Sequence, residues 1–425
     1  MAGAQQETFE LVDGLRSTAV IRVIGVGGGG CNTVNQMAQG GINGVEFIVA
    51  NTDRDHLEKC VTTNQLQIGA ALTRGLGAGS NPEIGRQSAD EDRERIAEML
   101  EGTDLLFITA GMGGGTGTGA APVIAEVAKE MKILTVAVVT KPFPSEGKKR
   151  MAQASQGIVQ LQQHVDSLIV IPNEKLKLVM GGSVTLMNAF KAANDVLQNA
   201  VLGISDLITR PGEINLDFAD VRTVMGARGM AMMGIGKAAG EDRAKKAVEA
   251  ALSSPLLDDI EIRGARGILV NITCDETLTL DEHDYIMQHV GDVASEEADI
   301  KCGTSIDPSL NGELRVTVVA TGLASSREVL PPHVARFSDA VARRPGVPGL
   351  GGQSSMGHMG HPAAQVQPRQ PQMTPRVPGL RPMPVDGGYA RPAQMAATGT
   401  HGKSWLEDLS DDVLDVPAFL RAQAD

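Results

Sequence analysis

The chain has 425 residues, a formal net charge of −13 and a hydrophobic fraction of 42%. This length exceeds one ordinary core and suits two domains with additional segments. The acidic charge provides no global field that attracts phosphate backbones, and an aromatic fraction of 3% argues against base-stacking platforms. We therefore expect no nucleic-acid partner.

The cysteines and the apolar runs bear on the compartment. Cys31, Cys60, Cys274 and Cys302 contain no C-x-x-C pair, so their spacing suggests neither a zinc site nor a disulfide framework and favours reduced thiols. No apolar run approaches the roughly 18 residues of a membrane-spanning helix, and the N-terminus lacks the layout of a signal peptide. We expect a cytoplasmic protein without direct membrane insertion.

The first part of the chain alternates strand-like and helical patterns after a polar N-terminal arm, residues 1–18. Helical patterns occupy 89–100 and 121–131. Buried strands are predicted at 19–26, 45–52, 104–111, 133–140 and 167–173. Continuously apolar strands that alternate with helices predict a parallel sheet covered on both faces, which is a Rossmann-like α/β domain over 19–182.

A change of pattern follows this domain. Apolar residues spaced by three or four predict one long central helix over 183–210, ended by Arg210-Pro211-Gly212. A strand at 266–274, a helix near 280–295 and a strand at 314–323 then predict a second, smaller α/β domain over 211–325.

The composition changes again near residue 330. Residues 345–403 are rich in Pro, Gly, Gln, Met and Ala, and we predict a disordered linker over 326–403. Residues 404–425 are acidic and apolar by turns. This last segment could pack on its own domain, but a long linker has no purpose there, so we favour a partner-binding peptide on a tether.

The first of two glycine loops lies in VIGVGGGGCNTVNQM, residues 23–37, between a predicted strand and a helix. Gly25, Gly27 and Gly30 match the pattern G-x-G-x-x-G, and Asp53 follows at a strand end. This arrangement is typical of dinucleotide binding. A dinucleotide-dependent oxidoreductase, using NAD or FAD, is therefore one open hypothesis.

The second glycine loop is GMGGGTGTG, residues 111–119, with a helix expected from about 119. Successive glycines turn N–H groups inward as an anion nest, and the helix N-terminus adds positive potential. The hydroxyls of Thr116 and Thr118 can donate to phosphate oxygens. A flexible turn or lid is the alternative. No lysine lies between 105 and 128, so the two loops together predict a nucleoside triphosphate site without a Walker lysine.

The segment GMGGGTGTGAAPVIA resembles the signature of the tubulin/FtsZ GTPases, and other segments are similar to the bacterial, cell-division branch of that family. They are VIGVGGGGCN, NTD, GLGAGSNPEIG, VVTKPFPSEGKKRM, FKAANDVL, RPGEINLDFADVRTVM, GTSIDPSL and LDVPAFLRAQAD. The resemblance implies binding of GTP and GDP, Mg2+ that bridges the β- and γ-phosphates, and GTP hydrolysis.

The resemblance also implies a set of nucleotide-binding residues. They are Gly28, Gly29, Gly30, Cys31, Asn32, Gly113, Gly114, Gly115, Thr116, Gly117, Thr118, Gly119, Thr140, Pro142, Glu146, Arg150, Asn173, Phe190, Asn194 and Asp195.

Some of these residues have a simpler interpretation. Glu146 and Arg150, four residues apart, could form only a surface salt bridge, although the resemblance assigns them to the ribose and phosphate. Phe190 could pack in the core instead of stacking on the base. Asp195 suits guanine, because a carboxylate accepts from the two donors on the guanine edge.

The catalytic candidates are Asn215, Asp217 and Asp220. Asp217 and Asp220 share one helix face, and Asn215 or Asp217 can cap that helix, so Asp217 could be a cap only. Clustered acids can also orient water and hold a cation during phosphoryl transfer. The resemblance implies that these residues act in trans on the next subunit of a head-to-tail filament. A scaffold that binds GTP without hydrolysis remains the other alternative.

The resemblance implies that the C-terminal peptide binds membrane adaptors and division regulators of the FtsA and ZipA type, at the mid-cell division site. The expected contacts are Asp415, Val416, Pro417, Phe419, Leu420 and Arg421. The chain departs from the family pattern at Ser145, Lys191, Cys274, Lys301 and Cys302.

Overall fold

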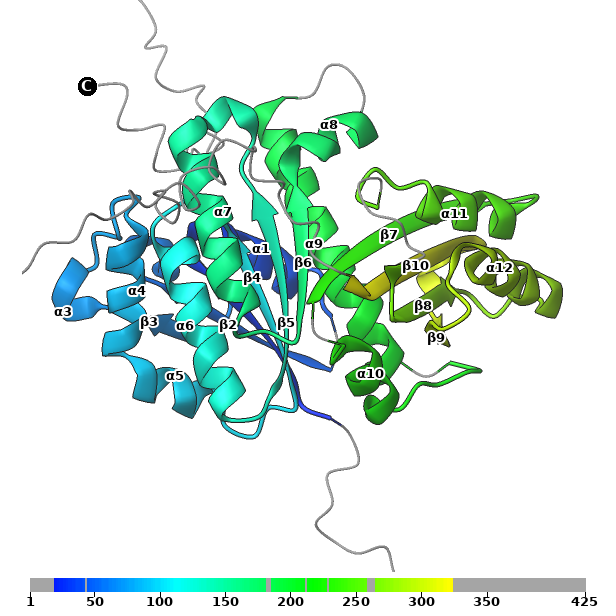
Figure 1. The fold of residues 1–425 in the computed structure, drawn as a ribbon, viewed down its shortest axis with the longest axis horizontal. Coiled ribbons are helices and arrows are strands. Elements are labelled where there is room, and N and C mark those ends of the chain that lie inside the picture. The colour runs from blue at the N-terminus through cyan, green and yellow to red at the C-terminus, as the bar shows by residue number, and fades with distance from the viewer. Residues whose placement is uncertain are drawn as a thin grey trace, which may run out of the picture. The chain divides into compact units, whose positions relative to one another are not determined.

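A computed structural model describes residues 19–42, 44–180, 185–210, 212–227, 229–257 and 264–323 of the chain (Figure 1). The predicted N-terminal arm, linker and C-terminal peptide lie outside the described residues, as do the six expected contacts of that peptide. None of the helices within the described ranges is long and apolar enough to cross a membrane.

The described strands form one ten-stranded sheet in the order β3-β2-β1-β4-β5-β6-β7-β10-β8-β9. The strands are β1 (Ile21–Val26), β2 (Val45–Asn51), β3 (Asn64–Gln67), β4 (Leu105–Gly111), β5 (Leu134–Lys141), β6 (Ser167–Pro172), β7 (Gly229–Ala239), β8 (Gly267–Cys274), β9 (Asp299–Ile306) and β10 (Glu313–Leu323).

Helices connect most of these strands. The α-helices are α1 (Gly27–Gln39), α2 (Arg54–Glu58), α3 (Ala70–Thr73), α4 (Pro82–Glu91), α5 (Arg93–Leu100), α6 (Thr116–Glu130), α7 (Lys148–Gln162), α8 (Asn173–Met180), α9 (Leu186–Thr209), α10 (Phe218–Met225), α11 (Arg243–Leu252) and α12 (Leu280–Val293). Short 3-10 turns are η1 (Pro144–Glu146) and η3 (Pro308–Leu310).

The pairing from β3 to β7 is parallel, whereas β10 pairs antiparallel with both β7 and β8. The chain order reverses between β1 and β4, so the carboxyl ends of these two neighbours form the switch point where open α/β sheets bind ligands. Residues 167–169 of β6 pair with 229–231 of β7, which joins the strands of the two predicted domains into one sheet.

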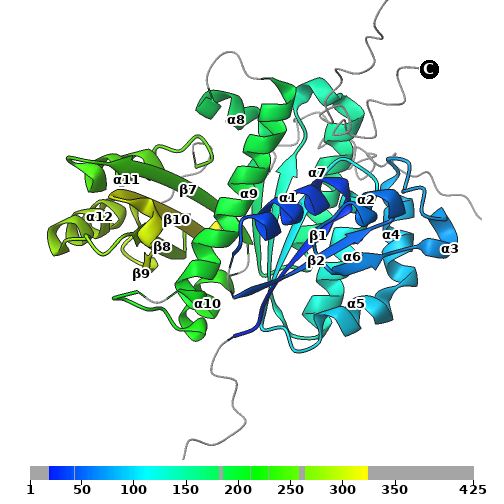
Figure 2. The same ribbon diagram turned by 180° about the vertical axis from the view of Figure 1, so that it is seen from behind.

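Alternate residues of the parallel strands pack on opposite faces of the sheet, as strand geometry requires. Val23 and Phe107 belong to a core with α1, α9 and α10, whereas Ile24 and Ile108 belong to a core with α6 and α7. Figures 1 and 2 show these two helical layers from opposite sides. A third core lies between α11, α12 and strands β8 and β10.

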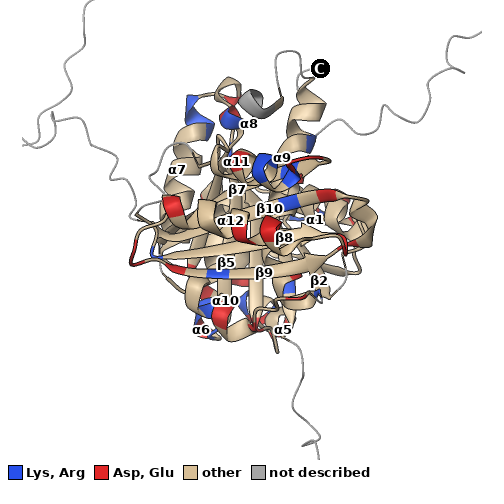
Figure 3. Ribbon diagram, turned by 90° about the vertical axis from the view of Figure 1, so that its right-hand side faces the viewer, with Lys and Arg blue, Asp and Glu red and all other residues tan. Residues whose placement is uncertain are grey.

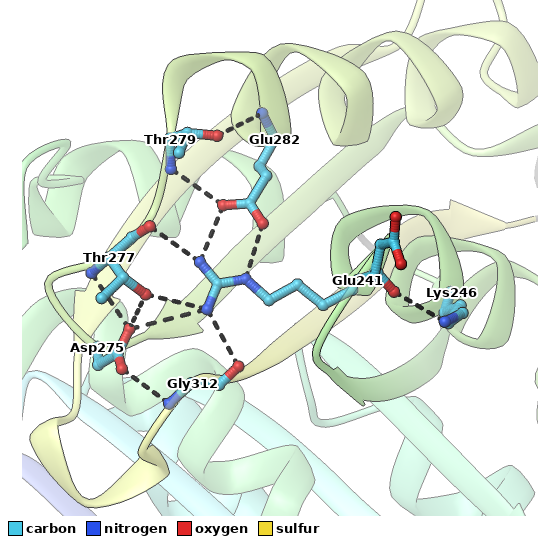
Figure 4. Close-up of polar contacts among 8 residues, drawn as sticks. Glu241, Lys246, Asp275, Thr277, Thr279, Glu282 and Gly312 are labelled. Atoms are coloured by element: carbon cyan, nitrogen blue, oxygen red, sulfur yellow. Dashed lines mark hydrogen bonds and ion pairs between the residues drawn. The ribbon is translucent and has the colours of Figure 1, made fainter.

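The buried guanidinium of Arg243 ties together the part of the fold that contains the third core (Figure 4). It donates to both Glu282 carboxylate oxygens at 2.7 and 2.9 Å, to Thr277, and to the carbonyl oxygen of Gly312 at 3.0 Å. The hydrogen bond from Arg243 lowers the pKa of Glu282. One side chain thus links α11, α12 and the turn before β10.

The structure confirms the predicted strands and corrects two helical boundaries. The segment 89–100 is broken at Asp92, the C-cap of α4 and N-cap of α5. Helix α6 begins at Thr116 and not near 119, because its glycines pack closely against neighbouring backbone. The sequence pattern also missed β3, β7 and β9.

Candidate functional site

The two glycine loops meet at the carboxyl ends of β1 and β4. Gly27 begins α1 with a φ of +68°, and a Cβ there would lie 2.7 Å from the backbone nitrogen of Gly117. A Cβ at Gly29 would lie 3.3 Å from the backbone of Gly111. These glycines allow one loop to rest on the other, backbone against backbone.

A second set of glycines allows α6 to approach α4. A Cβ on Gly119 would overlap the carbonyl oxygen of Pro82, and a Cβ on Gly115 would lie 2.8 Å from Ala78 Cβ. The sequence predicted that Gly115, Gly117 and Gly119 bind the nucleotide. In the structure these three glycines also have a packing role at the start of α6.

Some residues of the two glycine loops stay accessible to solvent near the starts of α1 and α6. Gly28, Gly29 and Asn32 are exposed at the start of α1, while Gly30 and Cys31 are buried behind them. Gly114 is half-buried, and a Cβ there would meet nothing within 4 Å. The first N–H groups of a helix have no intrahelical partner, so the starts of α1 and α6 both suit a bound anion.

The two threonines of the second loop brace it internally. The Gly113 N–H donates to Thr118 Oγ1 at 2.8 Å, and the hydroxyls of Thr116 and Thr52 lie 2.7 Å apart. Both loop threonines are buried. The hydroxyls of Thr116 and Thr118, which are predicted to donate to phosphate oxygens, thus also fix the shape of the loop.

The end of β5 and the segment after it line the other side of the second loop. A Cβ at Gly113 would lie 2.7 Å from the carbonyl oxygen of Arg150 and 3.0 Å from Pro142 Cγ, and buried Thr140 accepts a hydrogen bond from Met112 N–H through its carbonyl oxygen. This places the predicted residues Thr140, Pro142 and Arg150 beside the second glycine loop.

Glu146 forms the salt bridge expected from its spacing, with Arg150 Nε 3.3 Å from Glu146 Oε2. The two residues do not share a helix, because Glu146 lies in η1 and Arg150 in α7. Glu146 also accepts from the N–H of Phe143 at 2.7 Å, so its carboxylate fixes this turn.

Helix α9 carries the predicted base-side residues against α1. Thr33 Oγ1 donates to Asn194 Oδ1 at 2.9 Å, and Gln36 donates to the Asp195 carboxylate. Phe190 packs edge-on against the ring of Phe143, with ring centroids 5.5 Å apart.

Two buried amides stand out near the strand ends. Asn173 begins α8 directly after β6, and no described residue hydrogen-bonds its buried Oδ1. The Nδ2 of buried Asn51, at the end of β2, also has no partner among the described residues. A ligand can satisfy such groups. Asn51 was absent from the predicted set, and its signal in the sequence was a polar residue that ends a buried strand.

The predicted acids lie on the loop that leads into α10. Asp217 is the N-cap and accepts from Asp220 N–H at 2.8 Å, which confirms its capping role. Asn215 exchanges two hydrogen bonds with the backbone of Gly212, at 2.9 and 3.0 Å. Lys301 Nζ of the neighbouring strand β9 lies 3.2 Å from Asp220 Oδ1, and this carboxylate raises the pKa of Lys301. Figure 3 views β9 and α10 from this side, with basic residues in blue and acidic residues in red.

These acids lie near the amino ends of the parallel strands, whereas the glycine loops lie at the carboxyl ends. Ser167, the first residue of β6, donates to the Met225 carbonyl at 2.6 Å, so α10 packs at the amino ends of the strands. Helix α9 has 24 residues and joins these two ends, and at the usual helical rise it spans about 36 Å. Figure 1 shows α8 and α10 at opposite ends of the molecule.

Comparisons with known proteins agree with this architecture. The family model described as Tubulin/FtsZ family, GTPase domain, matches residues 20–181, and that of the FtsZ family C-terminal domain matches residues 229–324. A cell division protein FtsZ from Azotobacter vinelandii is 51% identical over 98% of this chain and 100% of its own length. The Pseudomonas aeruginosa protein of that name is 60% identical over 75% of this chain and 81% of its own.

Solved structures extend the comparison. An empty FtsZ dimer from M. jannaschii has a TM-score of 0.70 and 47% identity, and the match covers 72% of this chain and 89% of that one. GDP-bound CetZ1 from Haloferax volcanii has a TM-score of 0.63 and 19% identity, over 72% of this chain and 95% of that one, which shows a shared fold.

The sheet and its paired glycine loops define a GTPase of the tubulin class. This chain belongs to the tubulin/FtsZ family, with the FtsZ branch matched in both domains. As a GTPase it binds GTP and GDP, so the hypothesis of a dinucleotide-dependent oxidoreductase was wrong even though the strand order allows it.

Proposed function

We propose that this chain is a cell-division protein that assembles head to tail in the presence of GTP and hydrolyses it between subunits. The observation that carries the proposal is the separation of two chemically distinct groups. The open glycine backbone lies at the carboxyl ends of the strands, and Asp217 and Asp220 lie at the amino ends.

This separation favours catalysis in trans. The acids cannot reach the nucleotide of their own chain, because the full length of helix α9 separates the amino ends of the strands from their carboxyl ends. A second copy placed with its α10 end on the glycine loops would bring Asn215, Asp217 and Asp220 to the γ-phosphate. Such a heterologous contact does not close on itself and therefore grows an open filament.

The nucleotide end would bind through backbone and a few side chains. The N–H groups at the starts of α1 and α6 would hold the phosphates, with Gly28, Gly29 and Gly114 closest. Glu146 and Arg150 would contact the ribose and phosphate. Asn173, Asn194 and Asp195 would read the guanine, with Phe190 against the ring.

Mg2+ would bind to the nucleotide rather than to the glycine loops themselves. Backbone N–H groups are donors and cannot ligate a cation, so the phosphates themselves would supply most of its ligands. The ion would neutralise charge on the β- and γ-phosphates. Asp220 and Asp217 of the next copy would orient the attacking water, and phosphate release would weaken the contact between copies.

The proposed place of this activity is the cytoplasmic face of the mid-cell division site, because the curated relatives carry the name cell division protein FtsZ. Residues 415–421 would attach the filament to adaptors of the FtsA or ZipA type. Deletion of 411–425 should leave assembly in solution intact and abolish adaptor binding, and unchanged adaptor binding would refute the attachment.

Light scattering and phosphate release, measured together on the full chain across a dilution series, test the proposal. GTP should raise scattering above a threshold concentration, and turnover per chain should rise at the same threshold. Full turnover per chain below that threshold would refute catalysis between subunits. Scattering without phosphate release would instead support the scaffold that only binds GTP.

A further inference from the structure

Three metal-ligating side chains lie together beside the first glycine loop. Cys31 lies in α1 after β1, whereas His56 lies in α2 and Cys60 follows it, after β2. Because β1 and β2 are parallel neighbours, the segments that follow them lie at the same edge of the sheet, and Figure 2 shows α1 and α2 on the same face. The two sulfurs and a histidine nitrogen all lie within 4.8 Å of one another.

The present partners of these thiols are weak. Cys31 Sγ is 3.7 Å from the Gly25 carbonyl oxygen and 3.8 Å from that of Ala50, and Cys60 Sγ is 3.5 Å from the carbonyl oxygen of His56. The two thiols also interact with each other. A thiol is only a weak hydrogen-bond donor and acceptor. A metal ion that replaced these contacts would therefore displace little existing stabilisation.

The donor set selects the metal. Two thiolates and one imidazole are ligands that Zn2+ prefers, and three protein ligands leave a fourth tetrahedral position for water. Zinc–sulfur and zinc–nitrogen bonds of about 2.3 and 2.0 Å bring ligand atoms to within about 4 Å of one another. The observed cluster needs only a small contraction to reach that spacing.

We propose that Cys31, His56 and Cys60 form a Zn2+ site with one open coordination position. The backbone around the ligands is already fixed, since Asp53 accepts from the His56 N–H at 3.1 Å. Cys31 is fully buried, while His56 and Cys60 are half-buried, so an ion can enter from the His56 and Cys60 side.

The position of the site gives zinc a regulatory consequence. A Cβ at Gly28 would lie 3.7 Å from His56 Cε1, so the histidine ring lies next to the exposed start of α1. Bound zinc would tie α2 to α1 at this point and link metal occupancy to anion binding at α1. The metal site stands without the proposed filament function, and only this linkage rests on nucleotide binding at the loop.

Cobalt titration of the full-length, reduced, nucleotide-free protein tests the site. Co2+ should bind one per chain with thiolate-to-cobalt charge-transfer bands and tetrahedral ligand-field bands, and Zn2+ should abolish both. Cys60→Ser and His56→Gln should weaken binding at least about tenfold. The matched control is Cys302→Ser, a half-buried thiol 3.9 Å from His283 Nε2, which should bind as wild type does.

A second readout guards against variants that fold poorly. Zn2+ should protect Cys60 from alkylation by iodoacetamide in the wild type and in Cys302→Ser, but not in His56→Gln. Octahedral cobalt bands without thiolate charge transfer, or equal binding by Cys60→Ser, would overturn the proposal. So would a Cys31–Cys60 disulfide that accounts for thiol protection when no metal binds.

Discussion

At the carboxyl ends of β1 and β4 the molecule presents backbone N–H groups for binding, whereas at the α10 end it presents carboxylate side chains. The glycine loops are held by contacts that leave no room for a Cβ, as at Gly119 against Pro82. The α10 end is held by the N-cap Asp217 and by a partly exposed ion pair between Lys301 and Asp220. A binding surface made of N–H groups must be rigid, whereas a carboxylate that acts on another chain must be presented at the surface.

The largest expected effect on stability and binding comes from a substitution in the second glycine loop. Gly119→Ala places a methyl group on the Pro82 carbonyl, so α6 must move away from α4. We expect a loss of about 3 kcal/mol of unfolding free energy, measured in urea, together with loss of GTP binding. Gly114→Ala is the matched control, because nothing lies within 4 Å of its Cβ. Equal stability of the two variants would contradict the packing role.

Asp220→Ala addresses the side-chain end. GTP binding and GTP-dependent scattering should persist, because the substitution lies near the amino ends of the strands, far from the glycine loops. Phosphate release should fall about a hundredfold or more, as removal of a group that positions or deprotonates water does. A wild-type rate of phosphate release by assembled Asp220→Ala would remove this residue from the mechanism.

Asp217→Asn removes the negative charge of this side chain but keeps its ability to cap helix α10. Asparagine caps a helix about as well as aspartate, so the urea midpoint should stay within error of the wild type. If the carboxylate also acts on GTP, phosphate release should fall about tenfold or more. An unchanged rate would leave Asp217 as a cap only, which is the simpler interpretation of its hydrogen bond to Asp220.

Lys301→Ala should have the smallest effect. Its ion pair with Asp220 is partly exposed to solvent, so its removal frees that carboxylate with little change in stability. We expect phosphate release to rise by a small factor at low salt and the difference from wild type to shrink at high salt, where the pair is screened. A fall in rate would mean that Lys301 itself assists the reaction.

The sequence was sufficient for the strands whose apolar runs are continuous, such as β4 and β5, and for the long helix α9. It missed β7, because glycines and methionines give this strand a weak pattern and its place depends on pairing with distant β10. It missed β3 because that edge strand is polar.

Some features of the candidate site could likewise be predicted from the sequence, and others could not. The number of glycines in GMGGGTGTG indicated a special loop. The close packing of Gly115 on Ala78 and Asn81, and of Gly119 on α4, could not be predicted from that number. The cluster of Cys31, His56 and Cys60 has no local spacing signal, because Cys31 lies in a different β–α unit from the other two. Contacts between segments distant in sequence decided both cases.

Mixing two inactive variants tests the two-ended account most directly. Gly114→Asp should fold, because its Cβ has open space, but its carboxylate should repel the phosphates. Asp220→Ala keeps the nucleotide end and lacks the acid. Each alone should release phosphate slowly. An equal mixture should recover up to about half of the wild-type rate per chain, because only contacts that join the nucleotide of an Asp220→Ala chain to the acids of a Gly114→Asp chain are complete. A mixture no faster than the sum of its components would contradict catalysis between neighbouring chains.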